Sequence, residues 1–209
     1  MNKDSAFSDP RATWDNRFSQ PGFLFGKAPN AYLKSRAHLL ERGRRALAVA
    51  DGEGRNSVWL AGQGLAVDAF DISPVGVAKA RELAREEGAS VDFHVADCDA
   101  WNWRPEEYDY VAAIFVQFAD PAMRERLFAN MVRTLKPGGW LILQGYTPRQ
   151  LEYKTGGPGI LEHLYTEELL RTSFADLDIV ELDVYEAELN EGERHVGMSA
   201  LVGLTARKP

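Results

Sequence analysis

The chain is poor in the residues that build disulfides and metal centres. It has one cysteine, Cys98, and four histidines among 209 residues. A single thiol cannot form an intramolecular disulfide or a multi-thiolate metal site, and no two histidines have the spacing of metal ligands. We therefore expect no bound metal and a reducing, cytoplasmic compartment.

Basic residues and long apolar runs are also scarce. The 24 Lys and Arg residues are outnumbered by 31 Asp and Glu residues, which gives a formal net charge of −7. Because such a chain repels a polyphosphate at long range, we expect no nucleic-acid partner. No apolar run approaches the roughly 18 residues of a membrane span, and residues 1–10 lack the apolar core of a signal peptide. We expect no association with a membrane.

Strand-like and helix-like patterns alternate along the chain. The expected strands are residues 45–50, 66–71, 91–95, 108–116 and 140–143, and the expected helices between them are 56–61, 73–87 and 121–135. Beyond residue 145 we expect a short helix at 166–174 and two long strands, 178–188 and 193–206, joined by a turn at 190–192. The pattern predicts an α/β fold: a Rossmann-like, doubly wound, mostly parallel seven-stranded sheet with a C-terminal antiparallel hairpin and helices on both faces.

A chain of this length and composition fits a single domain, residues 1–209. The aromatic residues within the segment 1–43 predict that this segment is a helical lid across the ligand edge of the sheet. Residues 44–145 form the expected cofactor-binding core, and 146–209 supply a loop, a helix and the hairpin on the acceptor side. Because the hairpin leaves an open sheet edge, we expect a monomer or a weak homodimer.

The turn after the first strand is the strongest candidate for a ligand site. Glycines at 52 and 54 allow a ligand to approach the backbone, and Asp71 lies 17 residues after Gly54, at the end of the second strand. A carboxylate there can bind ribose hydroxyls. The turn also carries Asp51 and Glu53, whose charge would repel a pyrophosphate and favours a cationic nucleoside such as an adenosyl-sulfonium. A turn that serves packing alone is the alternative.

Several segments resemble one enzyme family. Gly-Arg-Asn-Ser-Val-Trp-Leu-Ala at 54–61, Val-Asp-Ala-Phe-Asp at 67–71 and Leu-Lys-Pro-Gly-Gly at 135–139 resemble class I S-adenosylmethionine-dependent methyltransferases. Trp-Asp-Asn-Arg-Phe at 14–18 and Phe-Gly-Lys-Ala-Pro-Asn at 25–30 are similar to the N-terminal segment of the tellurite-resistance and thiopurine methyltransferase branch. The resemblance implies an S-adenosylmethionine cofactor and methyl transfer to a small molecule, with a thiol, selenium or tellurium compound as the expected acceptor.

The resemblance also implies roles for individual residues. The ribose is assigned to Asp71 and the adenine to Ile72, Asp97 and Cys98, while Phe115 lines the pocket and Trp14 and Arg17 close over the methionine part. The remaining expected cofactor contacts lie in the first turn: Ala50, Asp51, Gly52, Glu53 and Asn56. Each has a purely structural alternative: Asp97 can cap a turn, Cys98 can be an inert buried thiol, and Phe115 can belong to the core.

One departure from the family pattern concerns the first turn. The family has an acid and a glycine where this chain has Ala48 and Ala50. Asp51 or Glu53 is the expected replacement for the acid, and the carbonyl of Ala50 is an alternative acceptor for the methionine amine.

On the acceptor side, His195 is the candidate base and Arg149 the candidate clamp for an anionic or soft acceptor. Ordinary solvated residues are the alternative for both. Two other functions stay open: a module that binds S-adenosylmethionine without catalysis, and a nicotinamide oxidoreductase on the same architecture.

Overall fold

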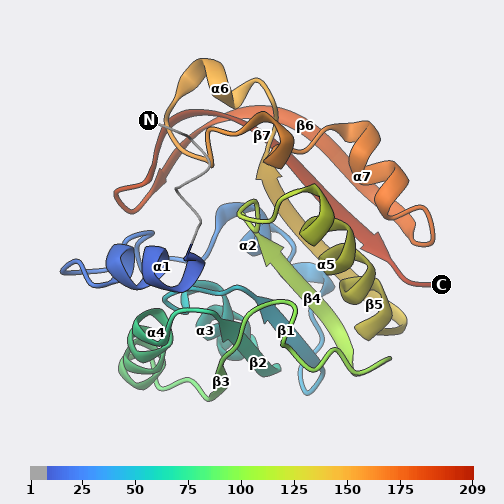
Figure 1. Cartoon of the computed structure of the whole chain (residues 1–209). Helices are drawn as coiled ribbons and strands as arrows, with labels where there is room; N and C mark the ends of the chain where they lie inside the picture. The colour runs from blue at the N-terminus through green and yellow to red at the C-terminus, as the bar shows by residue number, and fades with distance from the viewer. Residues whose placement is uncertain (1–8) are drawn as a thin grey trace.

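The computed structural model describes residues 9–209, in which seven strands form one sheet in the order β3-β2-β1-β4-β5-β7-β6 (Figure 1). Strands β1 (Arg45–Val49), β2 (Ala66–Asp71), β3 (Val91–Val95), β4 (Tyr108–Ile114) and β5 (Leu135–Tyr146) are parallel. Strands β6 (Asp178–Glu191) and β7 (His195–Arg207) form an antiparallel hairpin, and β7 pairs antiparallel with β5. The expected fold class is confirmed.

Helices cover both faces because the central strands are apolar on both sides. One face packs against α2 (Ala31–Ser35) and α3 (Arg55–Gly62), where Ala46 of β1 clusters with Leu33 and Leu60. The other face packs against α5 (Pro121–Thr134) and α7 (Glu167–Ser173), where Leu47 of β1 clusters with Met131. Alternate residues of one strand therefore enter two separate cores.

Helix starts follow the capping residues in the sequence. Ser73 accepts a hydrogen bond from Gly76 N at 3.0 Å at the start of α4 (Pro74–Glu86), and Pro74 occupies the first helical position. Asp120 accepts from Met123 N at 2.8 Å at the start of α5. Further short helices are α1 (Pro10–Phe18), η2 (Ala37–Leu39), α6 (Gln150–Tyr153) and η3 (Leu161–His163).

The structure differs from the sequence prediction at three boundaries. Strand β5 begins at Leu135 instead of residue 140, because residues 136–139 continue the strand instead of forming a turn. Strand β4 ends at Ile114, because Phe115 has a left-handed backbone (φ 57°) that cannot continue a strand. The hairpin turn lies at residues 192–194, so Glu191 is the last residue of β6.

The segment before β1 runs along the carboxyl ends of the parallel strands. Helix α1 lies beside α4 in Figure 1, and Glu193 N in the β6–β7 turn donates to Leu24 O at 3.0 Å. Residues 1–8 of the expected lid segment lie outside the described residues. Its part from residue 9 to residue 31, called the lid segment from here on, joins the β1–β2 side of the sheet to the hairpin. Within residues 9–209, no helix combines the length and hydropathy needed to cross a membrane.

Candidate functional site

The turn after β1 has the backbone of a glycine turn although one glycine is replaced. Ala50, Gly52 and Gly54 all have left-handed backbones, with φ angles of 48°, 61° and 90°. Gly54 also permits close helix packing, since a Cβ there would lie 2.7 Å from the Cβ of Ala80 in α4. Ala50 thus adopts a left-handed conformation that favours glycine, at some cost in backbone strain.

Asp71 connects this turn to the next helix. Its carboxylate accepts hydrogen bonds from Gly52 N and from Ser73 N, each at 2.9 Å. Burial raises the pKa of Asp71 to about 6 even though both bonds favour the charged form. Asp71 therefore lies at the carboxyl end of β2 beside the β1 turn, where a ribose-binding carboxylate belongs.

Asp51 provides a second carboxylate in the same turn, and its side chain is half-buried. It accepts from Ser57 N at 3.3 Å and from the Ser57 hydroxyl, and burial raises its pKa to about 7. The charge of Asp71 adds to this shift. Two neighbouring acids of raised pKa form an environment that a cationic ligand would stabilise.

Glu53 and Asn56 are directed toward the lid segment. Glu53 accepts from Leu24 N at 2.7 Å and pairs with Lys79 at 2.9 Å, and Asn56 accepts from Asn30 N at 3.0 Å. Lys79 also donates to the carbonyls of Gln20 and Gly22, at 2.8 and 2.7 Å. Two acids could replace the one missing at Ala48. Because Glu53 is bonded to the lid segment, Asp51 remains the candidate for this replacement.

Helix α1 covers the turn with aromatic side chains. Phe18 is 2% exposed, and a Cβ on Gly52 would lie 3.1 Å from its ring. Trp14 stacks on Phe18 at 5.3 Å between ring centroids, and the guanidinium of Arg17 lies 4.8 Å from the Trp14 ring centroid. Trp14 and Arg17 are thus positioned over the site through Phe18.

The residues expected around adenine follow β2 and β3. Ile72 is half-buried next to Asp71, and Asp97 accepts from Ala100 N at 2.8 Å, which is the turn-capping role. Cys98 is buried, and burial raises the pKa of its thiol, so it is unreactive near neutral pH. In the described part of the chain, no group of three or more His, Cys, Asp or Glu side chains is arranged to hold a metal ion.

Four rings meet beyond the ends of β4 and β5, and we call Phe25, Phe115, Tyr146 and His195 the aromatic box. The His195 ring centroid lies 4.4 Å from that of Phe115, 4.5 Å from that of Phe25 and 5.7 Å from that of Tyr146. The strained backbone of Phe115 directs its ring there. Among residues 9–209, neither Tyr146 Oη nor His195 Nδ1 has a hydrogen-bond partner, and both atoms are buried. The structure therefore brings the predicted residues Phe115 and His195 together.

Burial controls the charge of His195. It lowers the imidazole pKa, and the positive charge of Arg55 lowers it further, while Glu191 acts in the opposite direction. The lowered pKa favours a neutral ring that can accept a proton near neutral pH.

Arg149 does not join His195. Its guanidinium pairs with Glu186 at 2.6 Å, and its side chain is 60% exposed. Glu186 lies five residues along β6 from Glu191, the residue that pairs with His195 across the hairpin. That separation is about 17 Å at roughly 3.3 Å per strand residue.

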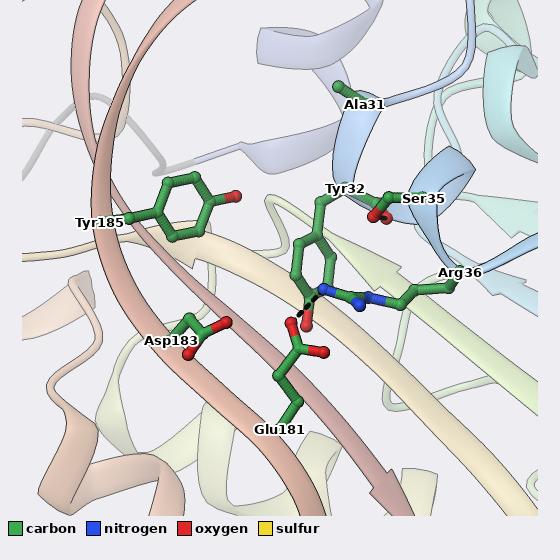
Figure 2. Close-up of a pocket in the computed structure, with 7 residues that line it drawn as sticks. All are labelled: Ala31, Tyr32, Ser35, Arg36, Glu181, Asp183 and Tyr185. Carbon is green, nitrogen blue, oxygen red and sulfur yellow. Dashed lines mark hydrogen bonds and ion pairs between the residues drawn. The ribbon is translucent and has the colours of Figure 1, made fainter.

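Figure 2 shows a groove between α2 and β6. It has a volume of about 360 Å³ and is lined by Tyr32, Arg36, Glu181, Asp183 and Tyr185, among others. Arg36 pairs with Glu181 inside it. Neither Asp71 nor any residue of the β1 turn lines this groove. We therefore assign the candidate site to the turn and the aromatic box.

Sequence reasoning missed Glu191, which was expected in a turn. Its carboxylate pairs with Arg55 at 2.8 Å and accepts from Asn30 Nδ2 and Ala31 N, each at 3.1 Å. The signal that could have revealed it is its register opposite His195, which depends on the turn being placed two residues later.

Comparison with known proteins gives one family match. Residues 46–139, from β1 to the start of β5, match a family model described as a methyltransferase domain. No curated protein matches the chain.

Solved structures share the fold. An S-adenosylmethionine-dependent methyltransferase from Methanosarcina mazei is 20% identical with a TM-score of 0.70, covering 87% of this chain and 98% of its own. The N-methyltransferase NodS from Bradyrhizobium japonicum, solved with S-adenosyl-L-homocysteine, is 14% identical with a TM-score of 0.72, covering 97% and 100%. TehB from Haemophilus influenzae is 17% identical with a TM-score of 0.72, covering 95% and 67%. The chain therefore has the Rossmann-like fold of S-adenosylmethionine-dependent methyltransferases, with a methyltransferase-domain match across its parallel core.

Proposed function

We propose that this protein transfers the methyl group of S-adenosylmethionine to a small-molecule acceptor. The observation that carries the proposal is the position of Asp71, bonded to Gly52 N in a left-handed turn at the carboxyl ends of β1 and β2. The donor set fits an adenosyl cation, because Asp71 can hold the ribose while Asp51 adds negative charge beside it. The family match over residues 46–139 supports the same cofactor.

The chemistry required of the chain is modest. The bound cofactor supplies an activated methyl group on a sulfonium, so the protein must bring the acceptor within about 3–3.5 Å of it and exclude water. The aromatic box and the lid segment surround this region with apolar surface. His195 accepts the proton that the acceptor loses when its bond to the methyl carbon forms.

The aromatic box favours a soft or neutral acceptor. The guanidinium beside the box, that of Arg55, is paired with Glu191, and that of Arg149 is paired with Glu186. An oxyanion would need an unpaired cation, whereas a thiol or selenol needs a base and a polarizable, apolar surface. We therefore place a thiol or selenol ahead of a tellurium oxyanion among the expected acceptors, and tellurite resistance remains a part of the proposal that rests on resemblance.

A binding module without catalysis is the second candidate. Ala48 stands where the family has an acid, and it is 2% exposed with no polar group to offer. This candidate predicts cofactor binding without turnover of any thiol, selenite or tellurite. The third candidate, an oxidoreductase, predicts binding of a nicotinamide cofactor instead. Titration with that cofactor tests it.

The deciding experiment is calorimetric titration with S-adenosylhomocysteine on the wild type, Asp71→Ala and Asp71→Asn. We expect Asp71→Ala to weaken binding at least tenfold, about 1.4 kcal/mol. Asp92→Ala, which removes an exposed carboxylate on β3, is the matched control and should bind like the wild type.

The outcomes separate the hypotheses. Absence of binding by the wild type at millimolar ligand refutes the proposal. Equal affinity of Asp71→Ala and the wild type removes Asp71 from the site. Thermal melts of each variant show whether lost binding reflects a lost fold, and Asp71→Asn keeps a hydrogen-bond acceptor for Gly52 and Ser73.

A further inference from the structure

Glu191 is a largely buried carboxylate, with four partners on three segments. It pairs with Arg55 in the first turn of α3, and it accepts from Asn30 and Ala31 at the end of the lid segment. The fourth partner is His195 of β7, whose Nδ1 lies 3.8 Å from Glu191 Oε2, within ion-pair range but beyond hydrogen-bond distance. The carboxylate thus joins the helix of the β1 turn, the lid segment and the candidate base.

The carboxylate of Glu191 is ionised near neutral pH. Burial alone would raise its pKa, but His195, Arg55 and the N–H of Ala31 lower it to about 2. An ionised carboxylate accepts hydrogen bonds and cannot donate one. The nitrogen of His195 that faces it is therefore stabilised when it carries a proton.

The imidazole has few other polar neighbours. Its ring lies against Phe25 of the lid segment, Phe115 after β4 and Tyr146 of β5. The charged groups facing it are Glu191 from β6 and Arg55 from α3, and Tyr146 is the titratable group on the remaining side. Apart from Glu191, none of these is a hydrogen-bond acceptor ionised near neutral pH.

We propose that Glu191 is the positioning residue for His195, holding the protonated Nδ1 side of the ring so that Nε2 is the nitrogen that accepts the proton of the acceptor molecule. This role rests on the proposed function for its chemistry. The carboxylate fixes the tautomer as carboxylates fix histidines elsewhere. Because it also holds Asn30, Ala31 and Arg55, the base is oriented when the lid segment is docked against the hairpin and α3.

The experiment is nitrogen-15 NMR of histidine-labelled protein, which reports the tautomer and pKa of each ring directly. The His195 signals are assigned by their loss in His195→Gln. In the wild type we expect the neutral ring to carry its proton on Nδ1. In Glu191→Gln we expect a larger fraction of the Nε2-protonated form and an imidazole pKa at least one unit lower, since a negative charge has been removed beside an imidazolium.

Glu188→Gln is the matched control, because it removes an exposed carboxylate from the same strand. It should leave the His195 signals unchanged. A wild-type ring protonated on Nε2, or a His195 spectrum unaffected in folded Glu191→Gln, overturns the proposal. If Glu191→Gln fails to fold, the wild-type tautomer still decides.

Titration of the same samples with S-adenosylhomocysteine separates this proposal from the function. Absence of ligand binding refutes the proposed function and leaves the tautomer result standing. Ligand binding together with a tautomer indifferent to Glu191 refutes only the positioning role.

Discussion

At the residue scale, the β1 turn contains a carboxyl group, that of Asp51, whose charged form is disfavoured. Asp51 has a folded-state pKa of about 7 against an ordinary value of 3.8, because burial disfavours its charged form. The folded protein therefore holds a proton that the unfolded chain releases at lower pH. The stability associated with this group is fully present below about pH 4 and is lost as the pH rises through 7.

We therefore expect Asp51→Asn to be stabilising at high pH. Its free energy of unfolding, relative to the wild type, should increase by about 2 kcal/mol between pH 5 and pH 8. Urea denaturation at the two pH values measures this. Asp92→Asn on the exposed side of β3 is the control. If the difference in free energy of unfolding between Asp51→Asn and the wild type is the same at pH 5 and pH 8, the pKa of Asp51 is not raised in the folded protein.

Residues of the site differ in how far the sequence could reveal them. Asp71 was found because its spacing from the β1 turn is a local property of two consecutive strands. Glu191 was missed because Asn30, one of its partners, lies 161 residues away. Arg149 was placed in the site by its loop, yet an ion pair with Glu186 directs it elsewhere.

At the element scale, the hairpin and the lid segment interlock through one glycine. Gly192 has a φ of 67°, and a Cβ there would lie 2.4 Å from Leu24 O. Gly159 has nearly the same φ, 69°, and open space around it. A side chain at either position carries the same conformational cost. Only at Gly192 does it also clash with the backbone of the lid segment.

We expect Gly192→Ala to be the more harmful of the two substitutions. Gly159→Ala should cost about 1 kcal/mol from its left-handed backbone. Gly192→Ala should cost about 2 kcal/mol more, because the lid segment must shift. Thermal unfolding compares them, and limited proteolysis within residues 19–30 should accelerate only in Gly192→Ala. Equal stability losses would show that the interlock adds nothing.

The element boundaries show what periodicity can and cannot supply. The strands β1, β2 and β3 were placed within a residue because their apolar alternation is local. The extension of β5 back to Leu135 was not expected, since Pro137 and two glycines usually mark a turn. Pairing of β5 with β7 over residues 140–146, and of Leu135 with Tyr108 of β4, outweighs that preference.

At the scale of the whole molecule, β6 is a long open edge. Within the described residues 9–209, its 14 residues pair only with β7, and Val180 and Val184 are 62% and 55% exposed. An exposed apolar edge strand invites pairing with another chain. The same strand carries six acids, at positions 178, 181, 183, 186, 188 and 191, which repel a second copy.

We therefore expect a monomer at neutral pH and micromolar concentration, held so by charge. The triple variant Asp178→Asn, Asp183→Asn, Glu188→Gln should associate, which size-exclusion chromatography with light scattering detects. Glu82→Gln, Glu87→Gln and Asp92→Asn remove three exposed acids elsewhere and should stay monomeric. A monomeric triple variant of β6 would mean that the edge is protected by shape and not by charge.

The packing of Phe18 has a consequence for the history of the protein. Its ring fills the space above Gly52 and Gly76, where added Cβ atoms would lie 3.1 and 2.9 Å from it. A side chain at either position would require the ring at position 18 to shift, and at position 76 it would also lie 3.0 Å from Gly52 O. We therefore expect relatives whose lid segment docks in the same way to combine an aromatic residue at position 18 with glycine at positions 52 and 76.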